Sequence, residues 1–487
     1  MRARSSTLLI CTVVLAAAST AQVPVLLKDI NPNGASNPGG FTCIGGVVYF
    51  SANDGVNGTE LWKTDGTEAG TVMVKDIEPG SGSSFPMTFM DVDGAIYFTT
   101  NDVANGVRLW TTDGTEGGTQ LALTLADVPG LLEWISFVPL GDRIFFRGHA
   151  TDTGRELWST DGTPAGTELF MDIHPGPNNS GFQNPMSHAG KIYFTASDGT
   201  NGAEPWMSDG TLAGTQMIAE TIAGPGSSGT TPTSYTAVGN LVFFRAGTSA
   251  TGDELWSTDG TVAGTGVVRD IYIGTNSSLP AYLTEHNGLL YLRAYNIVSN
   301  YIWQSDGTQA GTVALPLPTP AYTSAEYLCS HNGLLYFSGY NGTSRQLWRT
   351  DGSASGSQEV LYPGSDVVSP LSNSGPMLSC NGEMFFRANY MSAVGQEPYV
   401  LGLSTDVHEA AQDIAFIHPN PASHHLQFTG FPINAVVELY ATDGRMLRTA
   451  PTLDPLEVAD LPVGVYAARV RAQDGRVLHQ QLVLIER

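Results

Sequence analysis

Short apolar runs separated by polar turns recur along most of the chain. Eight runs rich in aliphatic and aromatic residues, such as VVYF at Val47 and AIYF at Ala95, occur along the chain, and Asp-Gly or Asn-Gly steps recur between apolar runs. Because Gly accepts positive φ, such steps between alternating apolar runs predict β-hairpins. One unit therefore contains four strands, at residues 86–92, 95–100, 107–112 and 119–125. A longer connection rich in Gly, Pro and Ser, such as residues 78–86, leads from one predicted sheet to the next.

These strands belong to a repeat of about 47 residues that carries a variant of ELWxTDGTxAGT. Seven copies contain a tryptophan, at spacings of 48, 48, 48, 50, 47 and 45 residues, and an eighth, diverged copy has Tyr399 in that position. The eight units fill residues 25–401. The tryptophans are Trp62, Trp110, Trp158, Trp206, Trp256, Trp303 and Trp348, and the aspartates of the Asp-Gly-Thr or Asp-Gly-Ser step are Asp65, Asp113, Asp161, Asp209, Asp259, Asp306 and Asp351.

Four strands per repeat at this period are typical of a β-propeller blade. The series begins with one unpartnered strand, residues 23–30, and ends with a unit of only three strands, residues 377–401. If the first strand completes the last unit, the ring closes and no sheet edge is left open. We therefore predict an all-β fold in which residues 23–401 form an eight-bladed β-propeller closed by the N-terminal strand, rather than a linear solenoid.

The repeated residues have a structural interpretation. A large aromatic residue on the third strand of each unit is expected to pack against the neighbouring blade. The repeated aspartate is expected to cap its hairpin through hydrogen bonds to the backbone, because a catalytic group would be needed only once. Binding of a cation is the alternative use of these carboxylates.

Composition and charge support this picture. Only 14% of the residues are charged and 56 of 487 are Gly, as expected for strands and tight turns rather than helices. The net charge of -24 opposes binding to nucleic acid or anionic membranes. We therefore expect no nucleic-acid partner.

The N-terminus predicts export. Arg2 and Arg4 precede an apolar stretch at residues 7–19, and Ser19-Thr20-Ala21 provides a signal-peptidase site, so residues 1–21 are expected to be a cleaved signal peptide. No later run is long enough for a transmembrane helix. The mature chain keeps three cysteines, Cys43, Cys329 and Cys380, for which we expect either a Cys329–Cys380 disulfide or free, half-buried thiols.

Candidate chemistry is sparse. No cofactor is indicated, and the best candidates for Ca²⁺ ligands lie in the loops that follow the second strand of three units, one carboxylate per loop. His188, His286 and His331 precede the first hairpin turn of their units and are expected to be surface residues. Two Asn-Gly-Thr sites match the N-glycosylation pattern but occur in loops where this match is common. The Ca²⁺ candidates are Asn53, Asp54, Asn57, Asn101, Asp102, Asn105, Asp198 and Asn201.

Motifs of the common enzyme classes are absent from the sequence, including G-x-S-x-G, H-E-x-x-H and the phosphate-binding P-loop. A pair of carboxylates contributed by different blades, as in a glycosidase, is left open. We expect a protein without catalytic activity.

The pattern changes after Leu401. Residues 402–414 are polar and are expected to form a linker, and residues 415–487 contain about seven short strands with Asp-Gly turns, which predict a small immunoglobulin-like β-sandwich. This segment carries HPNPAS at His418, VELYATDGRML at Val437 and DLPVGVY at Asp460. Its motif residues are Pro419, Asn420, Pro421, Gly444, Leu461, Gly464 and Tyr466.

Over essentially its whole length this segment resembles the type A C-terminal sorting domain of the bacterial type IX secretion system. The resemblance implies Sec export, passage through the outer membrane by the type IX machinery, and removal of the domain with release of the protein or its attachment to the cell surface. The extreme C-terminus, QQLVLIER, departs from the family, which more often has Lys there.

The repeat resembles the ELWxxDGTxxGT, or hyalin-like, repeats of exported bacterial proteins, for which no activity can be transferred. Taken together, the sequence predicts a secreted or surface-displayed propeller that binds an extracellular glycan or protein. Binding is expected on the loops equivalent to residues 53–58 and on the long inter-blade loops, because scaffolds vary where their sites lie. The alternatives are a polysaccharide hydrolase or lyase with its site at the propeller axis, and a structural surface-matrix component.

Overall fold

The computed structural model describes residues 23–102, 104–224, 232–297, 300–315, 324–362, 365–372, 374–401, 416–418, 425–429, 436–441, 445–451, 455–471 and 477–485. The chain divides into two compact units, Met1–Leu403 and Ser404–Arg487. The predicted signal peptide, residues 1–21, and the predicted linker, residues 402–414, lie outside the described residues.

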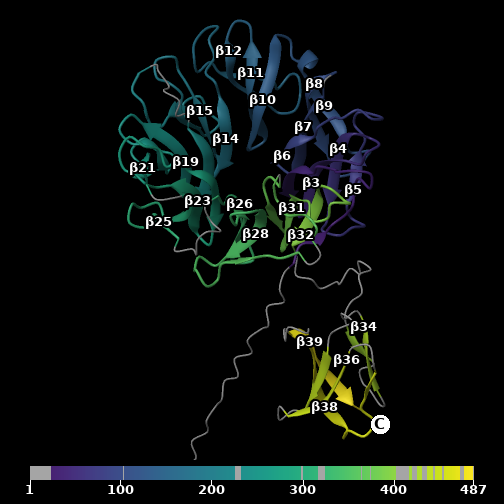
Figure 1. Ribbon diagram of the computed structural model, residues 1–487. Helices are drawn as coiled ribbons and strands as arrows, with labels where there is room; N and C mark the ends of the chain where they lie inside the picture. The colour runs from purple at the N-terminus through teal and green to yellow at the C-terminus, as the bar shows by residue number, and fades with distance from the viewer. Residues whose placement is uncertain are drawn as a thin grey trace, which may run out of the picture. The chain divides into compact units, whose positions relative to one another are not determined.

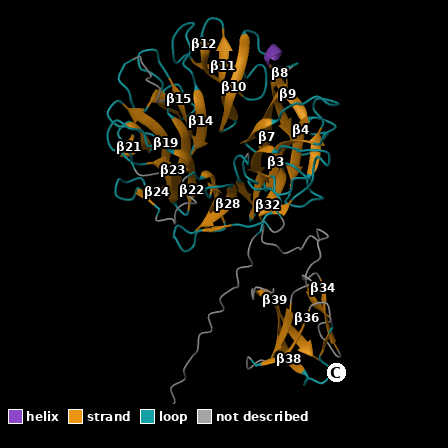
Figure 2. Cartoon of the chain, in the orientation of Figure 1, coloured by secondary structure: helices purple, strands orange, loops and turns teal. Residues whose placement is uncertain are grey.

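The first unit is built from eight four-stranded antiparallel sheets that follow one another along the chain (Figures 1 and 2). In the described part of the chain the helical structure is one short 3₁₀ turn, η1 (Leu125–Asp127). We number the sheets 1 to 8 in chain order. Their first strands lie innermost and contact the first strands of the neighbouring sheets. This arrangement confirms the predicted all-β class and is consistent with a β-propeller.

In sheets 1 to 4 the strands follow the chain order without crossovers. Sheet 1 contains β2 (Gly39–Ile44), β3 (Val47–Asn53), β4 (Thr59–Thr64) and β5 (Val72–Lys75); sheet 2 contains β6 (Met87–Val92), β7 (Ala95–Asp102), β8 (Gly106–Thr112) and β9 (Gln120–Thr124); sheet 3 contains β10 (Leu131–Leu140), β11 (Arg143–Ala150), β12 (Gly154–Thr160) and β13 (Glu168–Met171); sheet 4 contains β14 (Gln183–His188), β15 (Lys191–Ala196), β16 (Glu204–Ser208) and β17 (Gln216–Met217).

Sheets 5 to 7 repeat this order, and sheet 8 takes its fourth strand from the other end of the chain. Sheet 5 contains β18 (Thr233–Val238), β19 (Leu241–Thr248), β20 (Gly252–Thr258) and β21 (Gly266–Arg269); sheet 6 contains β22 (Ala281–His286), β23 (Leu289–Tyr295), β24 (Asn300–Ser305) and β25 (Val313–Ala314); sheet 7 contains β26 (Glu326–His331), β27 (Leu334–Tyr340), β28 (Arg345–Thr350) and β29 (Gln358–Glu359); sheet 8 contains β30 (Leu378–Cys380), β31 (Glu383–Ala388), β32 (Glu397–Leu401) and β1 (Val25–Leu26).

The N-terminal strand pairs with the last strand of the repeat region. β1 runs antiparallel to β32, with Val25 opposite Val400 and Leu26 opposite Tyr399. The backbone N–H of Leu27 adds a hydrogen bond of 3.0 Å to the carbonyl oxygen of Pro398. The two ends of the series are therefore held in one sheet, as the strand count predicts.

Neighbouring sheets share hydrophobic cores, which bury the aromatic residues of the repeat. Tyr49 and Leu61 of sheet 1, for example, pack with Phe98 and Trp110 of sheet 2. Sheets 8 and 1 are joined in the same way, because Leu27, Val48, Phe385 and Val400 form one buried cluster. Successive side chains of a strand point to opposite faces of its sheet. The apolar side chains on each face pack against the neighbouring sheet.

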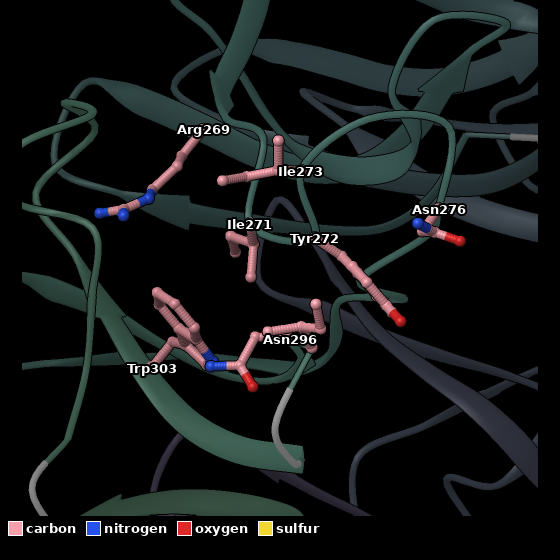
Figure 3. Close-up of a pocket in the computed structure, with 8 residues that line it drawn as sticks. Arg269, Ile271, Tyr272, Ile273, Asn276, Asn296 and Trp303 are labelled. Atoms are coloured by element: carbon pink, nitrogen blue, oxygen red, sulfur yellow. The ribbon is translucent and has the colours of Figure 1, made fainter.

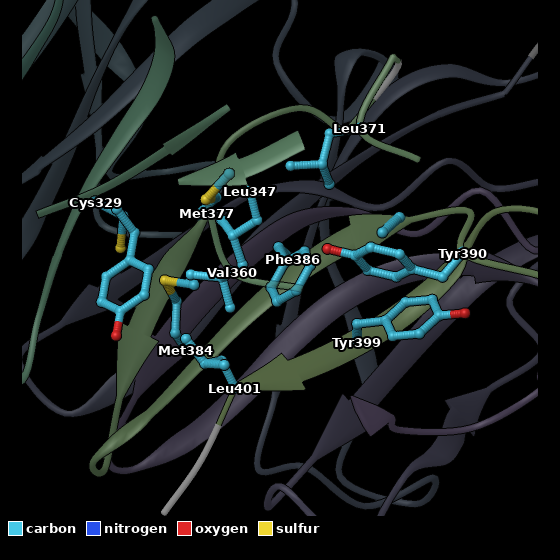
Figure 4. Packing of buried hydrophobic residues seen from close by; sticks show 12 residues of the cluster. Cys329, Leu347, Val360, Leu371, Met377, Met384, Phe386, Tyr390, Tyr399 and Leu401 are labelled. Atoms are coloured by element: carbon cyan, nitrogen blue, oxygen red, sulfur yellow. The ribbon is translucent and has the colours of Figure 1, made fainter. Parts of the chain in front are cut away.

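In the core between sheets 7 and 8, other aromatic residues take the place of the tryptophan that the diverged last copy lacks (Figure 4). Tyr399 is fully buried there, with its ring 5.1 Å from that of Tyr390 and 6.2 Å from that of Phe386. Tyr390 stacks in turn on Tyr362 at 4.7 Å. Burial raises the pKa of Tyr390 well above its usual value. Several aromatic rings thus fill the volume that one tryptophan occupies elsewhere.

The disulfide differs from the one considered from the sequence. Cys43 and Cys380 are bonded, with their Cα atoms 5.9 Å apart, whereas Cys329 is a buried free thiol. Of the two alternatives, the Cys329–Cys380 bridge is wrong because Cys380 faces sheet 1 and Cys329 faces the core between sheets 7 and 8. Free thiols are confirmed for Cys329 alone, which is buried rather than half-buried. Burial raises the pKa of Cys329 to about 12, so this thiol is unreactive.

A feature that the sequence did not predict recurs on the innermost strand. In sheets 1 to 7 the first strand contains a β-bulge, where one residue has positive φ. Such bulges re-aim a side chain. The residues with positive φ are Gly40, Thr88, Ser136, Asn184, Ser234, Tyr282 and Tyr327.

The second unit contains two antiparallel sheets that share one hydrophobic core. One sheet consists of β33 (Phe416–His418), β34 (His425–Thr429) and β37 (Leu456–Glu457), and the other of β35 (Val436–Tyr440), β36 (Met446–Pro451), β38 (Gly464–Arg471) and β39 (Val477–Ile485). Leu426 and Leu456 from the first sheet pack with Val437 and Tyr466 from the second. Throughout the described residues of both units, no helix is long and apolar enough to cross a membrane.

Candidate functional site

The Asp-Gly-Thr turns share one hydrogen-bond pattern. In sheet 1, Oδ1 of Asp65 accepts hydrogen bonds from the backbone N–H and the hydroxyl of Thr67, at 2.9 and 2.7 Å. The hydroxyl oxygen of Thr67 accepts a further bond from the N–H of Gly70. The bonds from Thr67 lower the pKa of Asp65. The same contacts from the residue two positions later are made to Asp113, Asp161, Asp209, Asp259, Asp306 and Asp351.

The structure places the repeated tryptophans between sheets. Six of the seven are between 5% and 9% exposed, and Trp348 is half-buried. Trp62 packs with Ile30 and Phe50, and Trp110 lies with its ring 6.3 Å from that of Phe98. Five of the six buried rings therefore offer a ligand no open face, whereas Trp303 contributes to the wall of a pocket. The seven are Trp62, Trp110, Trp158, Trp206, Trp256, Trp303 and Trp348.

Sequence reasoning missed a set of buried glutamates two residues before the aromatic position. The carboxylate of Glu60 is buried and accepts hydrogen bonds from the N–H of Ile77 and from the N–H and hydroxyl of Ser84. It therefore ties the inter-sheet loop to its own sheet. Buried carboxylates at the equivalent positions accept hydrogen bonds from the inter-sheet loop in four other sheets. The Glu that recurs two residues before the aromatic position of the repeat could have indicated this role from the sequence. They are Glu156, Glu204, Glu254 and Glu397.

The carboxylates considered as Ca²⁺ ligands already accept hydrogen bonds from residues of their own loops. Oδ1 of Asp54 accepts hydrogen bonds from the N–H groups of Val56 and Asn57, and Asp198 does the same with Thr200 and Asn201. The carboxylate of Asp102 is bonded to Asn105 and paired with Arg108. Asn53 is the last residue of β3, and Asn101 is the residue before the last of β7. Each loop thus holds one carboxylate, and the described residues contain no group of three His, Cys, Asp or Glu side chains placed to bind a metal ion.

Two of the three histidines are not surface residues. His286 and His331 are 3% and 1% exposed, because each ends the innermost strand of its sheet and points to the next sheet. Their Nδ1 atoms lie 2.8 Å from Oγ of Ser330 and 3.0 Å from Oγ of Ser379. The prediction of surface positions is wrong for these two, whereas His188 is half-buried, with Nε2 3.0 Å from the carbonyl oxygen of Gly239.

An apolar pocket of about 330 Å³ lies between sheets 5 and 6 (Figure 3). It is formed by the loop after β21 and the loop after β23, which belong to the two loop sets expected to bind a ligand. Ile271 and Trp303 form its buried wall, and Ile273 and Ile297, each 83% exposed, stand at its edge. The remaining lining residues are Arg269, Tyr272, Asn276 and Asn296.

The sequence at the edge of the pocket differs from that at two equivalent junctions. At two equivalent junctions a glycine of the loop after the second strand lies directly against the preceding inter-sheet loop. A Cβ atom at Gly55 would lie 2.5 Å from Asn31 Oδ1, and one at Gly199 would lie 2.2 Å from His174 Nε2. Ile297 takes this position in sheet 6, where it is 83% exposed and lines the pocket.

The charge in the pocket wall is a single arginine. The Arg269 guanidinium carbon lies 5.7 Å from the ring centroid of Trp303, and Nη1 donates hydrogen bonds of 2.6 and 3.3 Å to the carbonyl oxygens of Thr312 and Gln309. These contacts fix the cation beside the aromatic ring. The pocket therefore combines apolar side chains, two amide side chains and the positive charge of Arg269, whose guanidinium group is fixed by hydrogen bonds.

A second, more polar depression of about 400 Å³ lies among the first hairpin turns of sheets 3 and 4. Asp91, Leu140 and His188 contribute to its wall. Nε2 of His188 already contacts the carbonyl oxygen of Gly239, and Asp91 is the single carboxylate among the residues that line the depression. We find no arrangement there that would perform acid–base chemistry.

Part of the predicted sorting motif can be placed. Gly464 begins β38, Leu461 packs against the core of the second unit, and Tyr466 is buried in it. The Tyr466 hydroxyl donates a hydrogen bond of 2.6 Å to the carbonyl oxygen of Pro462. Pro419, Asn420, Pro421 and Gly444 lie outside the described residues.

No protein-family model and no curated protein sequence matches the chain. Solved structures similar to it include PorZ, a surface component of the type IX secretion system of Porphyromonas gingivalis, at 11% identity and a TM-score of 0.42 over 91% of this chain and 64% of PorZ. A prolyl endopeptidase matches at 11% identity and a TM-score of 0.47, over 92% of this chain and 56% of its own. Prolyl oligopeptidase B from Galerina marginata matches at 10% identity and 0.45, over 90% and 56%. This chain thus spans between 56% and 64% of the length of these proteins, and likenesses at this level assign no activity to it.

Proposed function

We propose that residues 23–401 form a closed eight-bladed β-propeller that acts outside the cell as a non-catalytic binding or adhesion module. Closure is supported by the pairing of β1 with β32 and by the Cys43–Cys380 disulfide between the first and last sheets. The observation that carries the binding role is the pocket between sheets 5 and 6, where Ile273 and Ile297, each 83% exposed, present apolar surface at the edge of an apolar cavity. Exposed apolar side chains around a pocket mark interaction sites.

The partner is an extracellular glycan or protein, and the pocket favours a protein segment. Its volume suits one large apolar side chain, and Trp303 and Ile271 supply the apolar contact. Asn276 and Asn296 stand at the edge, where amide groups can hydrogen-bond a peptide backbone. Arg269 adds a positive charge for a neighbouring acidic group.

Delivery to the outside is part of the same proposal. Residues 1–21 act as a signal peptide, and residues 415–487 act as a removable, immunoglobulin-like sorting domain recognised by the type IX secretion machinery. The motifs around Pro419, Gly444 and Tyr466 support this part of the proposal. The Cys43–Cys380 disulfide agrees with it, because such bonds persist in oxidising compartments.

Arrays of peptides and glycans, together with a turnover screen on polysaccharides, test the binding role on the chain that lacks residues 1–21. We expect binding without product formation. Ile273→Asp should abolish the binding of peptides, while Val262→Asp, at a 61% exposed position of an Asp-Gly-Thr turn, should not. Product formation would instead favour a hydrolase or lyase, and self-association without any binding would favour a structural matrix component.

A further inference from the structure

The innermost strands of sheets 6 and 7 differ from the others at the bulge. Tyr282 and Tyr327 both have φ of 55° there, a backbone region that is costly for bulky residues. The five other sheets place Gly, Thr, Ser, Asn and Ser at this position. Small or polar residues tolerate such a backbone at lower cost, so folding alone does not favour two tyrosines.

The two tyrosines form one half-buried cluster with charged residues. Their ring centroids are 5.1 Å apart in an edge-to-face arrangement, across the boundary between the sheets. The guanidinium carbon of Arg293 lies 4.7 Å from the ring centroid of Tyr282. The bulge thus turns an aromatic pair toward the arginine on the second strand of sheet 6.

A glutamate between two arginines completes the cluster. Oε1 of Glu326 lies 3.4 Å from Nη1 of Arg293 and 2.8 Å from Nη2 of Arg345. The side chains of Arg293, Glu326 and Arg345 are 20%, 24% and 19% exposed, so solvent reaches all three. Nε of Arg293 is buried and has no hydrogen-bond partner among the described residues.

The cluster carries an excess of positive charge. Two arginines, Arg293 and Arg345, pair with one glutamate, Glu326, which leaves these three side chains with a net charge of +1. The whole chain has a net charge of -24, so this is a local reversal of sign.

We infer that this arginine–tyrosine cluster at the inner ends of sheets 6 and 7 binds an acidic saccharide. A carboxylate on the sugar would bind the arginines, because guanidinium groups bind carboxylates through paired, charge-assisted hydrogen bonds. The apolar face of the sugar ring would lie against a tyrosine. The site is separate from the pocket between sheets 5 and 6, so either site could bind its ligand without the other.

Calorimetric titration with an oligomer of galacturonic acid tests this site, with an uncharged galactose oligomer of the same length as the reference. We expect the acidic oligomer to bind and the neutral one not to bind, and the affinity to fall with added salt. Arg293→Gln should weaken binding about tenfold or more. No binding of the acidic oligomer, or equal binding of both oligomers, would overturn the inference.

The double variant Tyr282→Ser/Tyr327→Ser separates a binding role from a packing role. Ser occupies the same bulge position in sheets 3 and 5, so the variant should keep its melting temperature and lose binding. Retained binding, or a lower melting temperature with unchanged affinity, would show that the tyrosines only fill space. Ile273→Asp should leave this binding intact, so failure of the pocket proposal and failure of this one are distinguishable.

Discussion

Cys43 and Cys380 are joined by a disulfide although 337 residues separate them along the chain. Cys43 belongs to the innermost strand of sheet 1 and Cys380 to that of sheet 8, so the covalent bond joins the beginning and end of the repeat series on the inside. The β1–β32 pairing joins them on the outside. The two ends are thus held at both edges of the last sheet.

Removal of the disulfide should destabilise the protein strongly. A cross-link that closes so long a loop restricts the unfolded chain, and the chain-entropy model gives a stabilisation on the order of 6 kcal/mol. The double variant Cys43→Ala/Cys380→Ala should therefore melt well below the wild-type protein in thermal unfolding monitored by circular dichroism.

The remaining cysteine supplies the control. Thiol titration of unfolded protein lacking residues 1–21 should find one free thiol per chain, from Cys329. Reducing agent should lower the melting temperature of the wild-type protein but not that of the double variant. Three free thiols in the oxidised protein would contradict the disulfide.

Deletion of residues 23–30 should also lower the melting temperature. The deletion removes β1, the buried side chain of Leu27, and the N–H of Ile30 that donates to Glu397. It also opens an edge of β32, which favours aggregation. Light scattering should detect this association. An unchanged melting temperature would show that the N-terminal strand contributes nothing to closure.

The strand order and the role of the first strand were predictable because they depend on short-range signals. Asp-Gly steps specify hairpins locally, and the tryptophan spacing fixes the period. Counting strands at the two ends then predicts the β1–β32 pair. The disulfide was not predictable in the same way, because the direction in which Cys380 points depends on the packing of sheets 8 and 1.

The candidate sites depend even more on tertiary structure. The buried position of His286 follows from the side of β22 on which it lies and from Ser330 in the next sheet. The pocket at Ile297 depends on how the loop after β23 lies beside the loop after β21. The bulges at Tyr282 and Tyr327 leave no sequence signal, because five different residue types occupy the bulge position across the seven sheets.

Stability should depend on the ionisation of the buried glutamates. Burial raises the pKa of Glu156 to about 7 and that of Glu397 to about 7, from 4.5. A group with a raised pKa binds its proton more tightly in the folded state. Its contribution to the free energy of unfolding is therefore full below pH 4.5 and is lost as the pH rises through about 7.

The variant Glu156→Gln tests this dependence, because an amide does not ionise. The variant should be less stable overall, since it loses an acceptor for the N–H groups of Ile173 and Ser180. Its melting temperature should nevertheless fall less than that of the wild-type protein between about pH 5 and about pH 8. Glu116→Gln, at an exposed position, should show the wild-type dependence. Parallel curves for Glu156→Gln and wild type would refute the assignment.

Adjacent glycines in the Asp-Gly-Thr turn of sheet 2 provide a matched test of the turn. A Cβ atom at Gly118 would lie 2.0 Å from Oδ1 of Asp113, whereas one at Gly117 would meet nothing within 4 Å. Gly118→Ala should therefore push the aspartate out of its hydrogen bonds with Thr115 and cost about 1–3 kcal/mol. Gly117→Ala should change the free energy of unfolding by no more than about 0.5 kcal/mol, or raise it slightly, because alanine restricts the unfolded chain. Urea unfolding of both variants measures the difference, and equal losses of stability would mean that the close contact with Asp113 does not determine the need for glycine.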